Sequence, residues 1–191
     1  MQATYPKAIA FVLEAEGNFS DDPSDSGGAT MAGITWRDAA AHRGIDPLTL
    51  RTDTAQVHLV KSLTPAEIQA IYKGRYWDAV EGDALPYPLD IVMFDSAVNL
   101  GIGSAVILLR LAMGLPVTPA NMRATMATVN EIGSRAAFVA HKLLALRRTR
   151  YRNIAAKNPQ DERFLKGWEA RVDNLEAAIK TDADNDADKG K

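Results

Sequence analysis

The sequence predicts a mainly α-helical fold with a small β-hairpin lobe near the N-terminus. From Leu63 onward, apolar residues recur at three- and four-residue steps, as helices with one buried face require. Ahead of them, the segment 21–28 is too rich in Asp, Ser, Pro and Gly to be helical. The chain contains no cysteine, so its hydrophobic core alone must hold the fold together.

The first elements are a helix and a hairpin. Residues 5–16 place Ile9, Val12 and Leu13 on one stripe, and Gly17 ends the pattern. After the turn-rich segment, residues 29–36 have the composition of a short strand. This part of the chain therefore predicts a helix that leads directly into a small hairpin.

The rest of the chain is predicted to be helical. Thr64-Pro65-Ala66-Glu67 is a capping box with proline at the first helical position. Further helices are expected over 88–100, 104–113, 120–128, 131–156 and 163–180. The last has an apolar stripe of Phe164, Leu165, Trp168, Val172, Leu175 and Ile179. The polar, acidic residues 181–191 have nothing to bury, and we expect them to be disordered.

Composition and charge limit the function. The chain has 191 residues, 47% hydrophobic and 24% charged, which is typical of a soluble globular protein. A net charge of −2 argues against a dedicated nucleic-acid binder. No signal peptide and no membrane-spanning segment are apparent, so we expect synthesis in the cytoplasm and no membrane insertion.

Charge is spread unevenly along the chain. Residues 1–97 contain 7 Lys/Arg and 14 Asp/Glu, whereas residues 135–180 contain 11 and 5. Arg147, Arg148, Arg150 and Arg152 belong to this basic half. This excess of Lys and Arg predicts either a surface that attracts an anionic polymer or a solvated helix face with paired charges.

Candidate catalytic residues lie in and around the turn-rich segment. Glu16 ends a helix with an apolar face, and apolar surroundings raise the pKa of a carboxyl group, as a proton donor requires. Asp25 and Thr30 follow among glycines, where a carboxylate and a hydroxyl can hold one water molecule. Two carboxylates beside a cleft are the usual equipment for glycoside hydrolysis, although acidic residues in turns are also common caps.

Four further residues are candidates for substrate binding. Tyr76 and Trp77 follow a predicted helix and offer flat apolar faces to a sugar ring, or else belong to the core. Asp95 and Asn99 lie one helical turn apart on an otherwise apolar helix. They hydrogen-bond either the glycan or buried polar groups of the protein, and we prefer the structural role for Asn99.

The order of Glu16, Asp25 and Thr30 resembles the Glu-Asp-Thr arrangement of phage-type lysozymes. A longer motif is closer still to glycoside hydrolase family 108: Glu16-Gly17-Asn18-Phe19, Asp25, Gly27-Gly28, Thr30 and Gly33-Ile34-Thr35. Tyr76-Trp77-Asp78, Leu85-Pro86 and the run from Phe94 to Gly101 also resemble that family. Asn18 replaces its usual second glycine, which asparagine's tolerance of left-handed backbone geometry allows.

The resemblance implies a lysozyme-like helical fold and an endolysin-type N-acetylmuramidase, active on peptidoglycan glycan strands without metal or cofactor. Glu16 would be the general acid, with Asp25 and Thr30 positioning water or stabilising the transition state. Residues 1–97 would form the hydrolase segment and residues 98–180 a peptidoglycan-binding-like segment, packed with it into one compact unit. We expect a monomer that reaches the wall after holin-type or other release.

Other functions stay open or are disfavoured. A lytic transglycosylase needs only Glu16, and a wall-binding or virion protein would have an inert catalytic lobe. The isolated His42, His58 and His141 lack metal-ligand spacing, and no Gly-x-Ser-x-Gly motif is present. A separation of about 6.5–9.5 Å between the two catalytic carboxyl groups would give inversion at the anomeric carbon, and about 5–5.5 Å would give retention. The sequence leaves both outcomes open.

Overall fold

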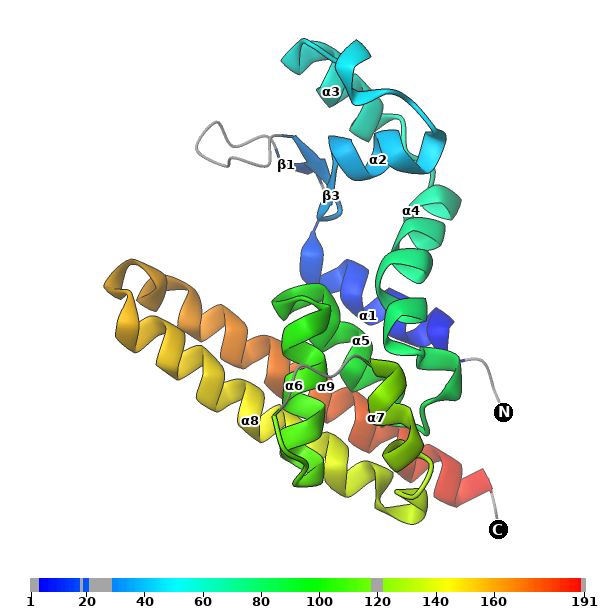
Figure 1. Cartoon of the computed structure of the whole chain (residues 1–191), viewed down its shortest axis with the longest axis vertical. Helices are drawn as coiled ribbons and strands as arrows, with labels where there is room; N and C mark the ends of the chain where they lie inside the picture. The colour runs from blue at the N-terminus through cyan, green and yellow to red at the C-terminus, as the bar shows by residue number, and fades with distance from the viewer. Residues whose placement is uncertain (1–3, 18, 21–28, 118–121, 190–191) are drawn as a thin grey trace. The chain divides into compact units, whose positions relative to one another are not determined.

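A computed structural model of the chain describes residues 4–17, 19–20, 29–117 and 122–189, without the side chains of 159 and 181–189. The chain divides into two compact units, Ile9–Asp78 and Met1–Ala8 with Ala79–Lys191. Figure 1 shows helices throughout and a small sheet near the N-terminus, which confirms the predicted fold class. Within the described part of the chain, no helix has the length and apolar character that a membrane crossing requires.

The unit Ile9–Asp78 contains the predicted helix and hairpin. Helix α1 (Tyr5–Glu16) has the predicted bounds and gives its first turn to the other unit. Strands β1 (Phe19–Ser20), β2 (Thr30–Met31) and β3 (Ile34–Thr35) form an antiparallel sheet in that order. Ala32 and Gly33 join β2 to β3 with φ values of 48° and 74°. Positive φ at both positions is typical of a type I′ turn, which matches the twist of a hairpin.

Three helices complete this unit: α2 (Trp36–Arg43), α3 (Asp53–Lys61) and α4 (Pro65–Tyr72). Each begins at a threonine whose hydroxyl accepts a backbone N–H of the first turn. The predicted capping box of α4 is present, with Thr64 and Glu67 bonding reciprocally. The sequence predicts neither α2 nor α3. Helix α2 buries only Trp36 and two alanines, which give little apolar periodicity.

The unit that includes Ala79–Lys191 is built around α5 (Leu89–Leu100), which is buried continuously from Leu89 to Ala97. Helices α6 (Ile102–Met113) and α8 (Ala136–Lys157) pack against it. Helix α7 (Met122–Val129) contacts α6, and α9 (Glu162–Lys189) runs beside α8 (Figure 1). The five helices correspond to those that the sequence predicts, with ends that differ by a few residues.

The largest difference is at the end of α9, which continues to Lys189 instead of stopping at Lys180. Extending an existing helix adds one hydrogen bond for each residue that it fixes, so no new nucleus is needed. The expected disorder of 181–191 therefore does not describe the backbone of 181–189, which is helical.

Candidate active site

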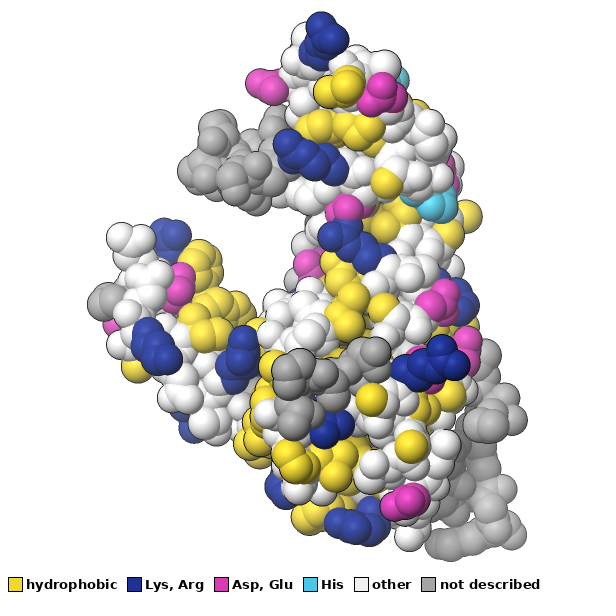
Figure 2. Space-filling view, in the orientation of Figure 1, with side chains coloured by type: hydrophobic (Ala, Val, Ile, Leu, Met, Phe, Trp, Pro, Cys, Tyr) yellow, Lys and Arg dark blue, Asp and Glu magenta, His cyan; other side chains and the backbone are white. Residues whose placement is uncertain are grey.

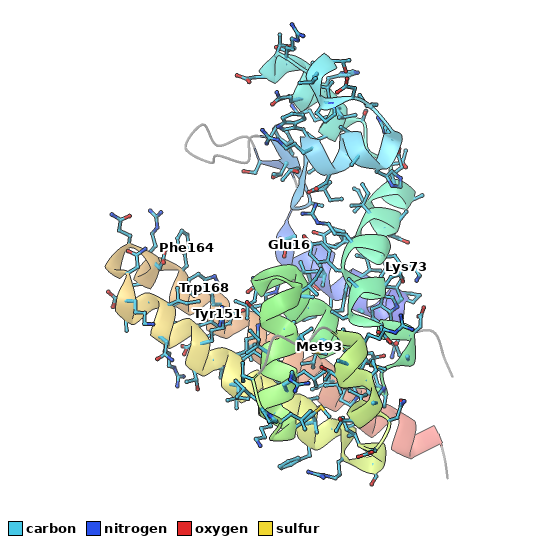
Figure 3. All side chains as sticks on the ribbon, viewed as in Figure 1. Glu16, Lys73, Met93, Tyr151, Phe164 and Trp168 are labelled. Carbon is cyan, nitrogen blue, oxygen red and sulfur yellow. The ribbon has the colours of Figure 1, made fainter. Side chains whose placement is uncertain are left out.

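Glu16 is the last residue of α1, and Gly17 ends the helix with a φ of 74° (Figure 3). The side chain is half-buried and reaches the hairpin turn. A Cβ atom added to Gly33 would stand 2.9 Å from Glu16 Oε2. Position 33 must therefore lack a side chain if the carboxyl group is to occupy this place.

Tyr72 approaches the same turn from α4. Its hydroxyl donates a hydrogen bond of 2.7 Å to the Ala32 carbonyl, and the side chain is 2% exposed. The Gly33 Cβ position would also stand 3.0 Å from that hydroxyl. Elements far apart in sequence, α1, the β2–β3 turn and α4, thus meet at the Glu16 carboxyl group. Tyr72 is not among the residues predicted from the sequence, where its one visible signal is its helical spacing from Tyr76.

Thr30 lies in β2, opposite Thr35 in the register of the hairpin. Thr35 in turn caps α2: its hydroxyl accepts from the Asp38 backbone N–H at 3.2 Å and donates to the Asp38 carboxylate at 2.9 Å. The guanidinium of Arg75 pairs with the same carboxylate. The strand beside Thr30 is therefore fixed to α2, and Arg75 joins α2 to the turn that follows α4. Asp25, the other expected water-positioning residue, lies outside the described residues.

Of the two expected aromatic faces, one is half-buried and the other belongs to the core. The Tyr76 ring lies 5.7 Å from the Tyr72 ring and 5.5 Å from the Arg75 guanidinium carbon. Trp77 is only 1% exposed, so its indole presents no face to a sugar. The expected substrate-binding role of Trp77 is corrected to a core role, because tertiary packing covers the ring.

Asp95 is also corrected to a structural role. Its carboxylate is 0% exposed and accepts hydrogen bonds from Arg147 Nη1 at 2.5 Å and Arg171 Nε at 2.9 Å. Two guanidinium groups thus compensate this buried charge, and no glycan can reach it. Asn99, one turn later, accepts a hydrogen bond from the Tyr151 hydroxyl. Neither residue belongs to the compact unit that holds Glu16.

Among the described residues, no three His, Asp or Glu side chains converge as metal ligands would. The described part of the site contains instead one half-buried carboxyl group, a glycine turn and a phenol. A carboxyl group fixed in this way can donate or accept a proton at a bound substrate.

Comparisons with known proteins support this reading. A family model described as glycosyl hydrolase 108 matches residues 9–101, which include Glu16, Gly33 and Tyr72. The structure of SagA from Brucella abortus superposes with a TM-score of 0.71 at 29% identity, covering 95% of this chain and 96% of that one. A comparison with curated proteins gives no match. Residues 9–101 of this chain are therefore similar to glycosyl hydrolase family 108.

Proposed function

We propose that this glycoside hydrolase is an N-acetylmuramidase, which cleaves the β-1,4 bond between N-acetylmuramic acid and N-acetylglucosamine in peptidoglycan. The family match supports the coarser statement, a hydrolase that acts on a glycan. The observation that carries the proposal is the Glu16 carboxyl group held against the Gly33 turn, at the end of a helix.

In the proposed reaction, Glu16 donates its proton to the glycosidic oxygen as the bond from that oxygen to C1 of muramic acid breaks. A water oxygen then bonds to C1; one proton of that water stays on the new hydroxyl group, and the other restores the starting protonation of the enzyme. Asp25 and Thr30 position this water or stabilise the positive charge that develops on the sugar. Tyr72 holds the turn against which Glu16 rests, so we assign it as a positioning residue.

The first experiment compares Glu16→Gln with Glu14→Gln on purified peptidoglycan. Glu14 is exposed and lies on the same helix, so its variant controls for loss of one negative charge. General acid catalysis contributes about 10²–10⁴-fold, and only Glu16→Gln should lose that much, with unchanged circular dichroism. Activity of Glu16→Gln within a few-fold of wild type would contradict the assignment.

The products of the wild-type reaction distinguish the remaining alternatives. After borohydride reduction, mass spectrometry should find reduced muramic acid ends. Anhydro-muramic ends would instead identify a lytic transglycosylase, and reduced glucosamine ends a glucosaminidase. No soluble fragments would favour a wall-binding or virion protein.

The biological setting that we propose is that of an endolysin acting as a monomer on the wall after release from the cytoplasm. Expression in a bacterial host should then lower culture turbidity only when a holin-type membrane lesion is also supplied. Lysis without any lesion would contradict the proposed release route.

A further inference from the structure

A second feature of interest lies in the other compact unit, on the α8–α9 pair. It is a groove of about 370 Å³, lined by Asn99, Arg150, Tyr151, Asp161, Phe164 and Trp168 among others. Figure 3 shows the labelled Tyr151, Trp168 and Phe164 side chains following one another along these helices. The groove lies wholly within the unit that contains Ala79–Lys191 and contains none of the residues discussed for catalysis.

Three aromatic rings form one platform in this groove. The rings of Tyr151 and Trp168 stack with centroids 5.1 Å apart and an interplanar angle of 23°. Phe164 continues the row, 5.9 Å from Trp168 and at 32° to it. Tyr151 is 1% exposed and forms the floor, whereas Phe164 is 45% exposed. Figure 2 shows hydrophobic side chains exposed on this part of the molecule, with Lys and Arg beside them.

A buried polar network holds the floor of the platform in place. The Tyr151 hydroxyl accepts a hydrogen bond of 2.6 Å from Arg147 Nε and donates to the Asn99 side-chain oxygen. Arg147 is itself fully buried and paired with Asp95. The ring therefore cannot turn without breaking this network. A platform fixed before binding loses little conformational freedom when a ligand arrives.

The four arginines over 147–152 do not all face solvent as unpaired charges. Arg147 is buried, Arg148 pairs with Asp173 at 2.7 Å and Glu176 at 2.9 Å, and Arg152 pairs with Glu169 at 2.7 Å. Of the four arginines over 147–152, only Arg150 has no carboxylate partner among the described residues. It donates to the Ser104 hydroxyl at 3.1 Å, and its buried Nε has no acceptor there.

We propose that this groove binds one pyranose ring of a glycan strand that carries carboxylate groups. The C–H face of the sugar would stack on Trp168, since aromatic faces carry partial negative charge. Phe164 would border the sugar, because the Arg163 guanidinium carbon already lies over its ring, 4.5 Å from the centroid. Arg150 would attract the carboxylate, and Asn99 and Asp161 would bond hydroxyl or amide groups. A predominantly apolar site with a few polar groups at its rim is typical of ligand pockets. The choice of a glycan rests on the proposed function, whereas the groove itself does not.

Fluorine NMR provides a direct test, because the chain has three tryptophans. Trp36 and Trp77 are 7% and 1% exposed, so Trp168 is the one that a groove ligand can touch. The full chain would be labelled with 5-fluorotryptophan in a Glu16→Gln background, and Trp168→Phe would assign the signal. The probes are a tetrasaccharide of alternating N-acetylglucosamine and N-acetylmuramic acid, and chitotetraose, which lacks carboxylates.

The Trp168 signal should shift on titration with the muramyl tetrasaccharide. Phe164→Ala should raise its Kd about tenfold, and Phe138→Ala, which removes an exposed phenylalanine elsewhere on α8, should change it less than about twofold. Arg150→Gln should raise the Kd for the muramyl probe about tenfold and leave that for chitotetraose nearly unchanged, while Arg152→Gln changes neither.

An unmoved Trp168 signal, or equal effects of Phe164→Ala and Phe138→Ala, would overturn the proposal. Equal weakening of both probes by Arg150→Gln would overturn the assignment of the carboxylate partner. These readouts do not depend on catalysis. If the wild-type chain cuts no glycan but its Trp168 signal shifts on titration, the proposed function is refuted and the proposed groove ligand is not.

Discussion

Replacing Gly33 with alanine tests whether the turn positions the Glu16 carboxyl group. The new Cβ would stand 2.9 Å from Glu16 Oε2, whereas ordinary contact begins at 3.4 Å. The carboxyl oxygen must therefore retreat by at least 0.5 Å. Because it is the far end of a flexible side chain, this movement costs little stability but changes the position of the proposed proton donor.

The backbone contributes a separate cost. Gly33 has a φ of 74°, and an L-residue in the left-handed region loses roughly 1–2 kcal/mol. For a chain of this size, that loss lowers Tm by about 2–8 °C. Gly44, which ends α2, provides the matched control: its φ is 65°, and its Cβ would meet nothing within 4 Å. Gly44→Ala should therefore carry the same strain without touching Glu16.

Both variants should melt a few degrees below wild type, as followed by circular dichroism. Turnover on purified peptidoglycan, measured well below both melting temperatures, should fall about 10–100-fold for Gly33→Ala and less than about twofold for Gly44→Ala. Equal turnover of the two variants would show that the contact with Gly33 does not position a catalytic group.

Three further substitutions test the surroundings of the site and the buried charges. Tyr72→Phe removes the hydroxyl that donates to the Ala32 carbonyl and should cost about 1 kcal/mol in urea unfolding and lower turnover more than substrate binding; unchanged kcat would reduce Tyr72 to a packing residue. Asp95→Asn leaves the buried guanidinium groups without their anion and should cost about 3–5 kcal/mol of stability. Glu169→Gln, at the more exposed pair with Arg152, should cost less than about 1 kcal/mol. Similar losses for the two variants would refute the role of Asp95 as the anion of the buried arginines. Burial raises the pKa of Asp90 in the folded protein. The contribution of Asp90 to stability is therefore complete below the pKa that it has in the unfolded chain, and it is lost as pH rises through the folded pKa. In unfolding measured from pH 3 to 7, the stability of Asp90→Asn should decline less than that of wild type, and parallel curves would refute this.

The elements around the candidate site were predictable where their signals are local. The apolar stripe of 5–16 and the break at Gly17 gave the bounds of α1, and the capping box at Thr64 gave the start of α4. A hairpin was expected here, but residues 29–36 were expected to form one strand, whereas they contain β2, the turn at Ala32-Gly33 and β3. The contact of Glu16, Gly33 and Tyr72 was not predictable, because it joins residues up to 56 positions apart whose packing no local pattern describes.

Residue type alone also failed to separate core aromatic side chains from exposed ones. Tyr76 and Trp77 are adjacent in sequence, yet Trp77 is in the core and Tyr76 is half-buried. Both residues lie in a π-helical turn over Lys73–Trp77. Such single-turn bulges alter the helical phase by one residue, and a reading that assumes 3.6 residues per turn does not anticipate them.

The stripe on α9 shows why periodicity is ambiguous about function. Val172, Leu175 and Ile179 are at most 3% exposed and belong to the core, as the pattern predicts. Phe164 and Trp168 continue the same three- and four-residue steps, but Phe164 is 45% exposed and Trp168 is half-buried. Periodicity fixes which face of a helix is apolar, whereas the elements packed beside it decide what that face contacts. Along the first turns of α9 the apolar face lines a groove with α8, and a sugar is the ligand that we propose for its stacked rings and Arg150.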